Sequence, residues 1–192
     1  MTLLKKFSAS ILLLLFVVGC SQQQSKNQQM DNEPSTNYSK AVAVVHPTEG
    51  NEVTGSVTFT KEDEGVRVQA NFEGLSQGRH GFHIHQYGDC TASDGTSAGG
   101  HYNPTGNKHG SPTQDNRHMG DMGNLAVSED GSATLDYVDP KIKLNGPNGI
   151  IGRGIIVHGG EDDFESQPSG AAGPRVGCGV VGIAKGNTSA GM

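Results

Sequence analysis

Two histidines in the segment 82–85, Phe-His-Ile-His, have the spacing of metal ligands on a β-strand. Side chains along a strand alternate between its two faces, so His83 and His85 should share one face while Phe82 and Ile84 occupy the other. Both imidazoles would then reach the same metal ion. Further candidate ligands follow downstream, at His101, His109, His118, Asp121 and His158.

Each part of this set also has a less specific explanation. His83 and His85 alone are compatible with two surface histidines at a strand edge. The histidines between 101 and 118 are compatible with a surface segment that binds metals loosely. The order of the full set, with Asp121 three residues after His118, favours defined metal sites over both alternatives.

Short β-strands should position these side chains. Alternating residues and apolar runs between turns predict eight strands, at 41–45, 55–60, 66–72, 81–86, 124–127, 133–137, 155–158 and 179–184. The segments 62–65 and 129–132 are typical of hairpin turns, and no segment has a long 3.6-residue periodicity. The sequence therefore predicts an all-β fold, an eight-stranded antiparallel Greek-key β-barrel or sandwich.

Two predicted connections, 87–123 and 159–177, are much longer than the others. Loops of this length without regular structure are uncommon and usually functional. One begins soon after His85 and the other directly after His158. We therefore expect both loops to fold over the bound metals.

Residues 1–19 are predicted to be a signal peptide. Lys5 and Lys6 precede the apolar run 11–18, which is too short to favour a membrane span. The segment Val-Val-Gly-Cys that ends at Cys20 is similar to a bacterial lipobox and predicts a diacylated cysteine that anchors the chain to a membrane. The alternative is an ordinary secretory signal. Residues 20–38 contain few apolar side chains and predict a flexible tether before a domain at 39–192.

The remaining cysteines and the net charge indicate in which compartment the protein lies and which partners it excludes. With Cys20 lipidated, Cys90 and Cys178 are an even pair in an exported chain, so we expect a disulfide between them. Two free buried thiols are the alternative. The formal net charge is −6, and removal of residues 1–19 takes away two lysines and no acidic residue, which leaves −8. Such a surface argues against a nucleic-acid partner.

The ordered ligand set resembles that of the copper,zinc superoxide dismutase family, over nearly all of residues 40–185. The similar segments are Gly-Phe-His-Ile-His-x2-Gly-Asp, Ser-Ala-Gly-Gly-His-Tyr-Asn-Pro, Gly-Asp-Met-Gly-Asn-Leu and Cys-Gly-Val-Val-Gly-Ile. The resemblance implies two metal sites. Copper would be bound by His83, His85, His101 and His158, and zinc by His101, His109, His118 and Asp121. His101 would bridge the two metals.

The resemblance also implies roles around the metals. Asp162 would accept hydrogen bonds from His83 and His109, because metal-bound histidines usually donate their second N–H to a carboxylate. The alternative for Asp162 is a solvated acidic run. Arg175 would attract and orient the superoxide anion, whereas a solvated loop arginine is its alternative. His101 would deliver a proton to the departing peroxide, and His80 would bond to the backbone.

The implied function is disproportionation of superoxide to dioxygen and hydrogen peroxide by a redox-active copper beside a structural zinc. We expect an exported, membrane-anchored enzyme of the cell envelope, on a periplasmic or extracellular face. A homodimer is one form in which bacterial members of the family occur. The competing hypothesis is a catalytically silent copper- and zinc-binding module of the envelope. The complete set of candidate ligands favours the enzyme.

Overall fold

The computed structural model of the protein describes residues 37–186. The predicted signal peptide 1–19, the predicted lipid site Cys20 and all but the last two residues of the predicted tether 20–38 lie outside the described residues. Within them the regular structure consists of β-strands, and a short 3₁₀ helix, Thr96–Ala98, is the single helical element of this part. No helix in residues 37–186 has the length and apolar character needed to cross a membrane.

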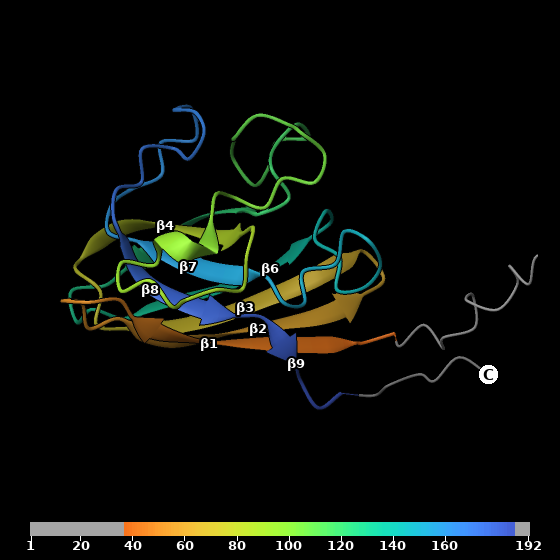
Figure 1. Cartoon of the computed structure of the whole chain (residues 1–192), viewed down its shortest axis with the longest axis horizontal. Helices are drawn as coiled ribbons and strands as arrows, with labels where there is room; N and C mark the ends of the chain where they lie inside the picture. The colour runs from red at the N-terminus through yellow and green to blue at the C-terminus, as the bar shows by residue number, and fades with distance from the viewer. Residues whose placement is uncertain (1–36, 187–192) are drawn as a thin grey trace, which may run out of the picture. The chain divides into compact units, whose positions relative to one another are not determined.

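Nine antiparallel strands make up the described fold (Figure 1). They are β1 (Lys40–Pro47), β2 (Thr54–Glu62), β3 (Gly65–Glu73), β4 (Gly78–His85), β5 (Asp121–Val127), β6 (Ala133–Asp139), β7 (Gly154–His158), β8 (Arg175–Val180) and β9 (Gly182–Ile183).

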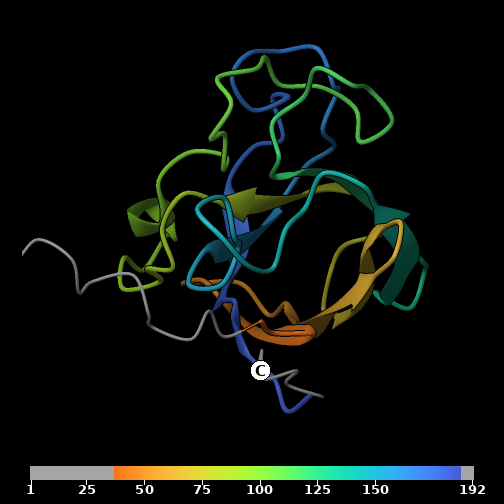
Figure 2. The ribbon, with the colours of Figure 1, turned by 90° about the vertical axis from the view of Figure 1, so that its right-hand side faces the viewer.

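Eight of these strands form one hydrogen-bonded series in the order β5-β4-β7-β8-β1-β2-β3-β6, and the short β9 pairs with β1. The series curls round until its end strands, β5 and β6, approach each other, as Figure 2 shows from one end. The connections from β3 to β4 and from β6 to β7 cross between non-neighbouring strands. The predicted all-β antiparallel barrel is therefore confirmed.

The barrel core is formed by every second residue of the strands, because successive side chains of a strand point to opposite faces. In β3, Val66, Val68, Ala70 and Phe72 are buried and the residues between them face outward. The rings of Phe72 and Phe82 meet edge-to-face with centroids 5.5 Å apart inside the barrel. Burial of each such side chain stabilises the fold by roughly 1.5–3 kcal/mol.

Strands β4 and β7 are the exception, because they are buried on both faces. Phe82 and Ile84 belong to the barrel core, yet His83 and His85, on the outward face of β4, are only 0% and 1% exposed. The outward-facing Ile156 of β7 packs instead with Ala98 and Cys178. Loops must therefore cover this side of the barrel.

Those covering loops are the connections 86–120 and 159–174, which stand on the same side of the barrel in both views. The prediction for the last strand was wrong in position. A strand was expected at 179–184, whereas β8 already begins at Arg175 and β9 follows after Val181. Glycines at 177 and 179 weaken the strand pattern there, and pairing with β7 overrides it.

Candidate metal centre

Strand pairing places the first candidate ligands side by side. His83 of β4 lies opposite Asp121 of β5 on one side and opposite Ile156 of β7 on the other. His85 forms an isolated antiparallel bridge with His101, which brings the start of the first long loop against the end of β4. Backbone register alone therefore positions three histidine or aspartate side chains around His83.

Gly120 allows the same loop to return to β4 before β5 begins. Its carbonyl accepts the Ile84 N–H at 2.9 Å, and its own N–H donates to the Tyr102 carbonyl at 2.9 Å. A Cβ at position 120 would lie 3.0 Å from the Tyr102 nitrogen and closer still to the Ile84 carbonyl oxygen. Only glycine fits this close approach.

Four histidines form the first ligand group: His83, His85, His101 and His158. One nitrogen from each ring lies within 4.8 Å of the corresponding nitrogen of every other ring. These atoms are His83 Nδ1, His85 Nε2, His101 Nε2 and His158 Nε2, and all four are buried without a hydrogen-bond partner. Buried polar atoms are normally satisfied, so four converging exceptions fit a shared metal ion.

The opposite nitrogen of each ring is tied down. His83 Nε2–H donates to Asp162 Oδ2 at 2.7 Å, and His85 Nδ1–H donates to the Gly99 carbonyl at 2.9 Å. His158 Nδ1–H donates to the Gly173 carbonyl at 3.1 Å. These bonds fix each tautomer so that the free nitrogen carries a lone pair toward its neighbours.

Burial keeps these imidazoles neutral. It lowers the pKa of His83 to about 3, although Asp162 opposes the shift, and lowers the pKa of His158 to about 4. The pKa of His85 is also lowered, first by burial and then by the neighbouring His101. Neutral imidazoles are the form that binds metal.

The second group consists of His101, His109, His118 and Asp121. Asp121 Oδ1 lies 2.8, 3.0 and 3.3 Å from the Nδ1 atoms of His101, His109 and His118. The last contact lacks a hydrogen bond and leaves His118 Nδ1 unpartnered. Ligands on a tetrahedral zinc ion, with bonds of about 2.0–2.1 Å, lie about 3.3 Å apart, so these four residues fit zinc closely.

Asp121 is held as a carboxylate in this group. Burial by itself would raise its pKa, but the close contacts with His101, His109 and His118 outweigh burial and lower it. Its second oxygen accepts the backbone N–H groups of Gly110 at 3.1 Å and His118 at 3.0 Å. His101 belongs to both groups, because its Nδ1 faces Asp121 while its Nε2 faces the first group.

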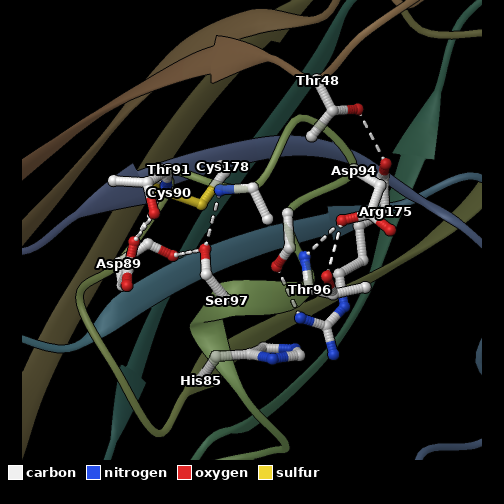
Figure 3. The surroundings of a disulfide bond; sticks show 12 residues. Thr48, His85, Asp89, Cys90, Thr91, Asp94, Thr96, Ser97, Arg175 and Cys178 are labelled. Atoms are coloured by element: carbon white, nitrogen blue, oxygen red, sulfur yellow. Dashed lines mark hydrogen bonds between the residues drawn. A yellow bond between two sulfur atoms is a disulfide. The ribbon is translucent and has the colours of Figure 1, made fainter.

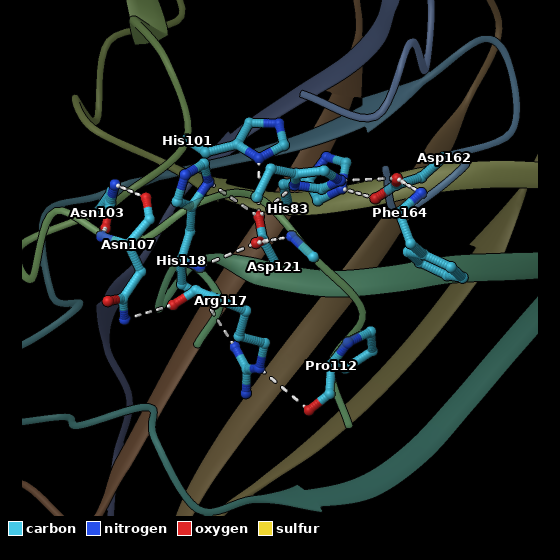
Figure 4. Close-up of polar contacts among 12 residues, drawn as sticks. His83, His101, Asn103, Asn107, Pro112, Arg117, His118, Asp121, Asp162 and Phe164 are labelled. Carbon is cyan, nitrogen blue, oxygen red and sulfur yellow. Dashed lines mark hydrogen bonds and ion pairs between the residues drawn. The ribbon is translucent and has the colours of Figure 1, made fainter. Parts of the chain in front are cut away.

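Asp162 connects the two groups (Figure 4). It is fully buried, and its Oδ1 accepts the His109 Nε2–H at 2.8 Å while its Oδ2 accepts the bond from His83. Burial disfavours a charged His109, but the Asp121 and Asp162 carboxylates outweigh it and raise its pKa to about 9. Asn124 fixes the Asp162 backbone through two hydrogen bonds of 2.8 and 2.9 Å.

The disulfide predicted between Cys90 and Cys178 is confirmed (Figure 3). It ties the first part of loop 86–120 to β8, next to Arg175. The Arg175 guanidinium donates to the Gly95 and Gly99 carbonyls of this loop, each at 2.6 Å. Figure 3 places the guanidinium close to His85, so a fixed cation lies beside the first ligand group.

Two other histidines lie outside both groups. His80 Nδ1–H donates to the His158 carbonyl at 2.8 Å, and the Ser76 hydroxyl lies 3.2 Å from His80 Nε2, so His80 contacts backbone as expected. His46 is exposed on β1.

Arg117 also supports the site, although its role was not predicted from the sequence. This arginine is fully buried and pairs with Asp139 at the end of β6, with 2.6 Å between Nη2 and Oδ2. It also donates to the His118 carbonyl at 2.9 Å and the Pro112 carbonyl at 3.0 Å. Its position directly before a candidate ligand was the available signal, but nothing in the sequence identified Asp139 as its partner.

Comparisons with known proteins agree with this geometry. Residues 53–181 match the copper/zinc superoxide dismutase (SODC) family. The chain is 42% identical over 157 residues to the extracellular superoxide dismutase [Cu-Zn] of Brugia pahangi, across 77% of this chain and 78% of that protein. The crystal structure of the clock protein EA4 superposes with a TM-score of 0.71 at 42% identity, across 78% of this chain and 97% of that one. The chain belongs to the copper/zinc superoxide dismutase family.

Proposed function

We propose that this protein is an exported superoxide dismutase, which converts two superoxide anions and two protons into dioxygen and hydrogen peroxide. One observation carries the proposal: four buried, unpartnered imidazole nitrogens converge beside a second ligand group that shares His101. Membership of the copper/zinc superoxide dismutase family supports the same reaction.

The two groups divide the metals by their chemistry. His83, His85, His101 and His158 would hold copper, because an all-imidazole set suits this metal. His101, His109, His118 and Asp121 would hold zinc in a closed tetrahedral site without an open position. Copper, when bound, supplies the one-electron chemistry by alternating between its Cu(II) and Cu(I) states.

The side chains around the groups perform the remaining steps. Arg175 attracts the superoxide anion and orients it, since its guanidinium is fixed by two carbonyls beside His85. His101 Nε2 holds a proton when it is not a ligand and delivers it to the departing peroxide. Asp162 keeps His83 and His109 in their ligating orientations.

The direct test uses the mature protein, disulfide-bonded and loaded with copper and zinc. Inhibition of superoxide-driven dye reduction should appear at full metal occupancy and disappear after chelation. A protein that retains both metals but does not inhibit the reaction would support the alternative, a catalytically silent metal-binding module. The complete ligand set already favours the enzyme.

The location of the enzyme is a second part of the proposal. A signal peptide at 1–19, lipidation of Cys20 and a tether at 20–38 would place the domain 39–192 at a membrane surface of the cell envelope. The disulfide between Cys90 and Cys178 supports export, as does similarity to an extracellular relative. Mass spectrometry of the mature N-terminus should find diacylglycerol on Cys20, and an unmodified cleaved terminus would contradict the anchor.

A homodimer is the third part. Val44 of β1 and Val180 of β8 are 55% and 41% exposed, and the pairing of Val45 with Gly179 puts both on the outward face of the sheet. A second copy of the chain that covers these two valines would remove apolar surface from water. Sedimentation of the loaded enzyme should give a dimer, and Val44→Glu should give a monomer.

A further inference from the structure

Gln167, in the loop 159–174, contacts the backbone of a residue in the other long loop. Its Oε1 accepts the His109 N–H at 2.9 Å, and its Nε2 donates to the His109 carbonyl at 3.0 Å. One side-chain amide thus pairs with both backbone polar groups of a single residue, as a neighbouring strand would. In residues 37–186 these are the hydrogen bonds that the His109 backbone makes.

The segment that carries Gln167 is itself ordered by local bonds. Asp163 accepts the backbone N–H groups of Glu165 at 2.9 Å and Ser166 at 2.8 Å, and also the Ser166 hydroxyl at 2.6 Å. The Gly170 carbonyl accepts the Asp163 N–H at 2.9 Å, which closes the turn. Gln167 therefore extends from a fixed turn rather than from a freely moving loop.

His109 is the residue for which such a tie matters most. Its side chain lies between Asp121 on one ring nitrogen and Asp162 on the other, and the residue is 4% exposed. Its backbone, however, belongs to a long loop without strand pairing. Without the Gln167 amide, the His109 N–H and carbonyl would have only water as a partner, and the backbone would lose the contact that fixes it relative to Asp162.

We infer that Gln167 is a positioning residue for zinc, which holds the ligand His109 in place by pairing with its backbone from the opposite loop. The inference rests on the proposed zinc group but not on dismutase activity. Loss of the amide removes both hydrogen bonds to the His109 backbone and a third, from Gln167 Nε2 to the Glu165 carbonyl at 3.2 Å. Loss of outer partners of metal ligands typically weakens binding by about 10–100-fold. Gln167 is exposed to water, so we expect the low end of this range.

The test measures zinc release from the full mature protein loaded with both metals. Gln167→Ala should release zinc to a chromogenic chelator about tenfold faster than the wild-type protein and release copper at the wild-type rate. Gln167→Glu keeps an acceptor for the His109 N–H but loses the donor, so its zinc release should be intermediate. Gln69→Ala, which removes a surface amide on β3 that bonds to Asp136 of β6, is the matched control and should change neither metal.

Two further measurements distinguish positioning of His109 by Gln167 from a general destabilisation of the fold. Amide hydrogen exchange at His109 should be faster in Gln167→Ala even without metal, while exchange in the barrel strands stays unchanged. The absorption spectrum of cobalt placed in the zinc site should shift as His109 moves. The inference is wrong if Gln167→Ala releases zinc at the wild-type rate, or if it releases zinc and copper faster by the same factor.

The outcomes also distinguish this inference from the proposed function. If the wild-type protein retains zinc but lacks dismutase activity, the proposed function is wrong and the role of Gln167 still stands. An active wild-type enzyme whose Gln167→Ala variant keeps zinc normally removes only the role of Gln167. A wild-type protein that takes up no zinc at this group removes both.

Discussion

The two ligand groups differ in what holds them. His83, His85 and His158 stand on the paired strands β4 and β7, so the barrel itself sets their spacing. His101, His109 and His118 come from the loop 86–120, and of the second group Asp121 alone belongs to a strand, as the first residue of β5. The copper-type group is thus built on the scaffold, whereas the zinc-type group depends on contacts that order a loop.

Those loop contacts are specific and come from far away in the sequence. Arg117 reaches Asp139 on β6, Gln167 reaches His109 from the second loop, and Asp162 reaches His109 and His83. Metal coordination adds to the same task, because it draws four side chains together. Loss of a single contact should therefore disturb the zinc-type group more easily than the copper-type group.

The largest effect is expected from His158→Ala, which removes one strand-borne ligand. Activity should fall to the background of the metal-free protein, because the copper-type group loses one of its four nitrogens. Zinc should remain bound, since the second group is untouched. Metal analysis and the dye-reduction assay measure both results.

His46→Ala is the matched control for that change, because His46 is exposed on β1 and belongs to neither group. It should leave activity and metal content unaltered. Equal loss of both metals from His158→Ala would contradict the division of ligands proposed above.

An intermediate effect is expected from Arg117→Ala, which removes one of the contacts that order the loop 86–120. The substitution leaves Asp139 as a buried carboxylate without its cation, a change that typically costs about 3–5 kcal/mol of unfolding free energy. Zinc release should accelerate more than copper release, because Arg117 also holds the His118 carbonyl. Denaturant unfolding and chelator kinetics measure the two effects.

Arg67→Ala provides the control for Arg117→Ala, because it removes an arginine–aspartate ion pair that is exposed to water. Arg67 Nε and Asp136 Oδ1 lie 2.8 Å apart, but the two side chains are 43% and 44% exposed, so loss of this pair should cost much less stability than loss of the buried pair. If both arginine variants lose the same stability, the buried pair does not anchor the loop.

The smallest effect is expected from Arg175→Glu, which changes no ligand. Superoxide capture at low ionic strength should slow by about tenfold, because an anion replaces the fixed cation beside His85. Added salt should slow the wild-type enzyme and speed the variant, since screening weakens attraction in one and repulsion in the other. An unchanged low-salt rate would exclude a steering role, and Arg175→Lys separates charge from the bonds to Gly95 and Gly99.

Much of the fold followed from local pattern. Alternation along 66–72 and the apolar runs around Phe82 and Ile155 predicted strands that the structure contains, and they gave the all-β barrel. The final strand was displaced because its first half is rich in glycine and gains its order from pairing with β7. Local propensity cannot register such long-range pairing.

The candidate ligands could be listed from the sequence because residue type and order carry that signal. Arg117 and Gln167 could not be recognised, since their meaning lies in partners 22 and 58 residues away. An arginine or a glutamine in a loop usually bonds only to solvent, and only the folded structure shows which of them bond to distant residues.

The sequence by itself determined the chemistry of this protein: the seven side chains that can bind metal, the strands that carry three of them, and the cysteine pair. The tertiary structure decided which nitrogen of each imidazole is free, that His101 lies between both groups, and which distant residues fix the loops. Ligand identity is a property of single residues, whereas orientation arises from buried hydrogen bonds between segments that only folding brings together.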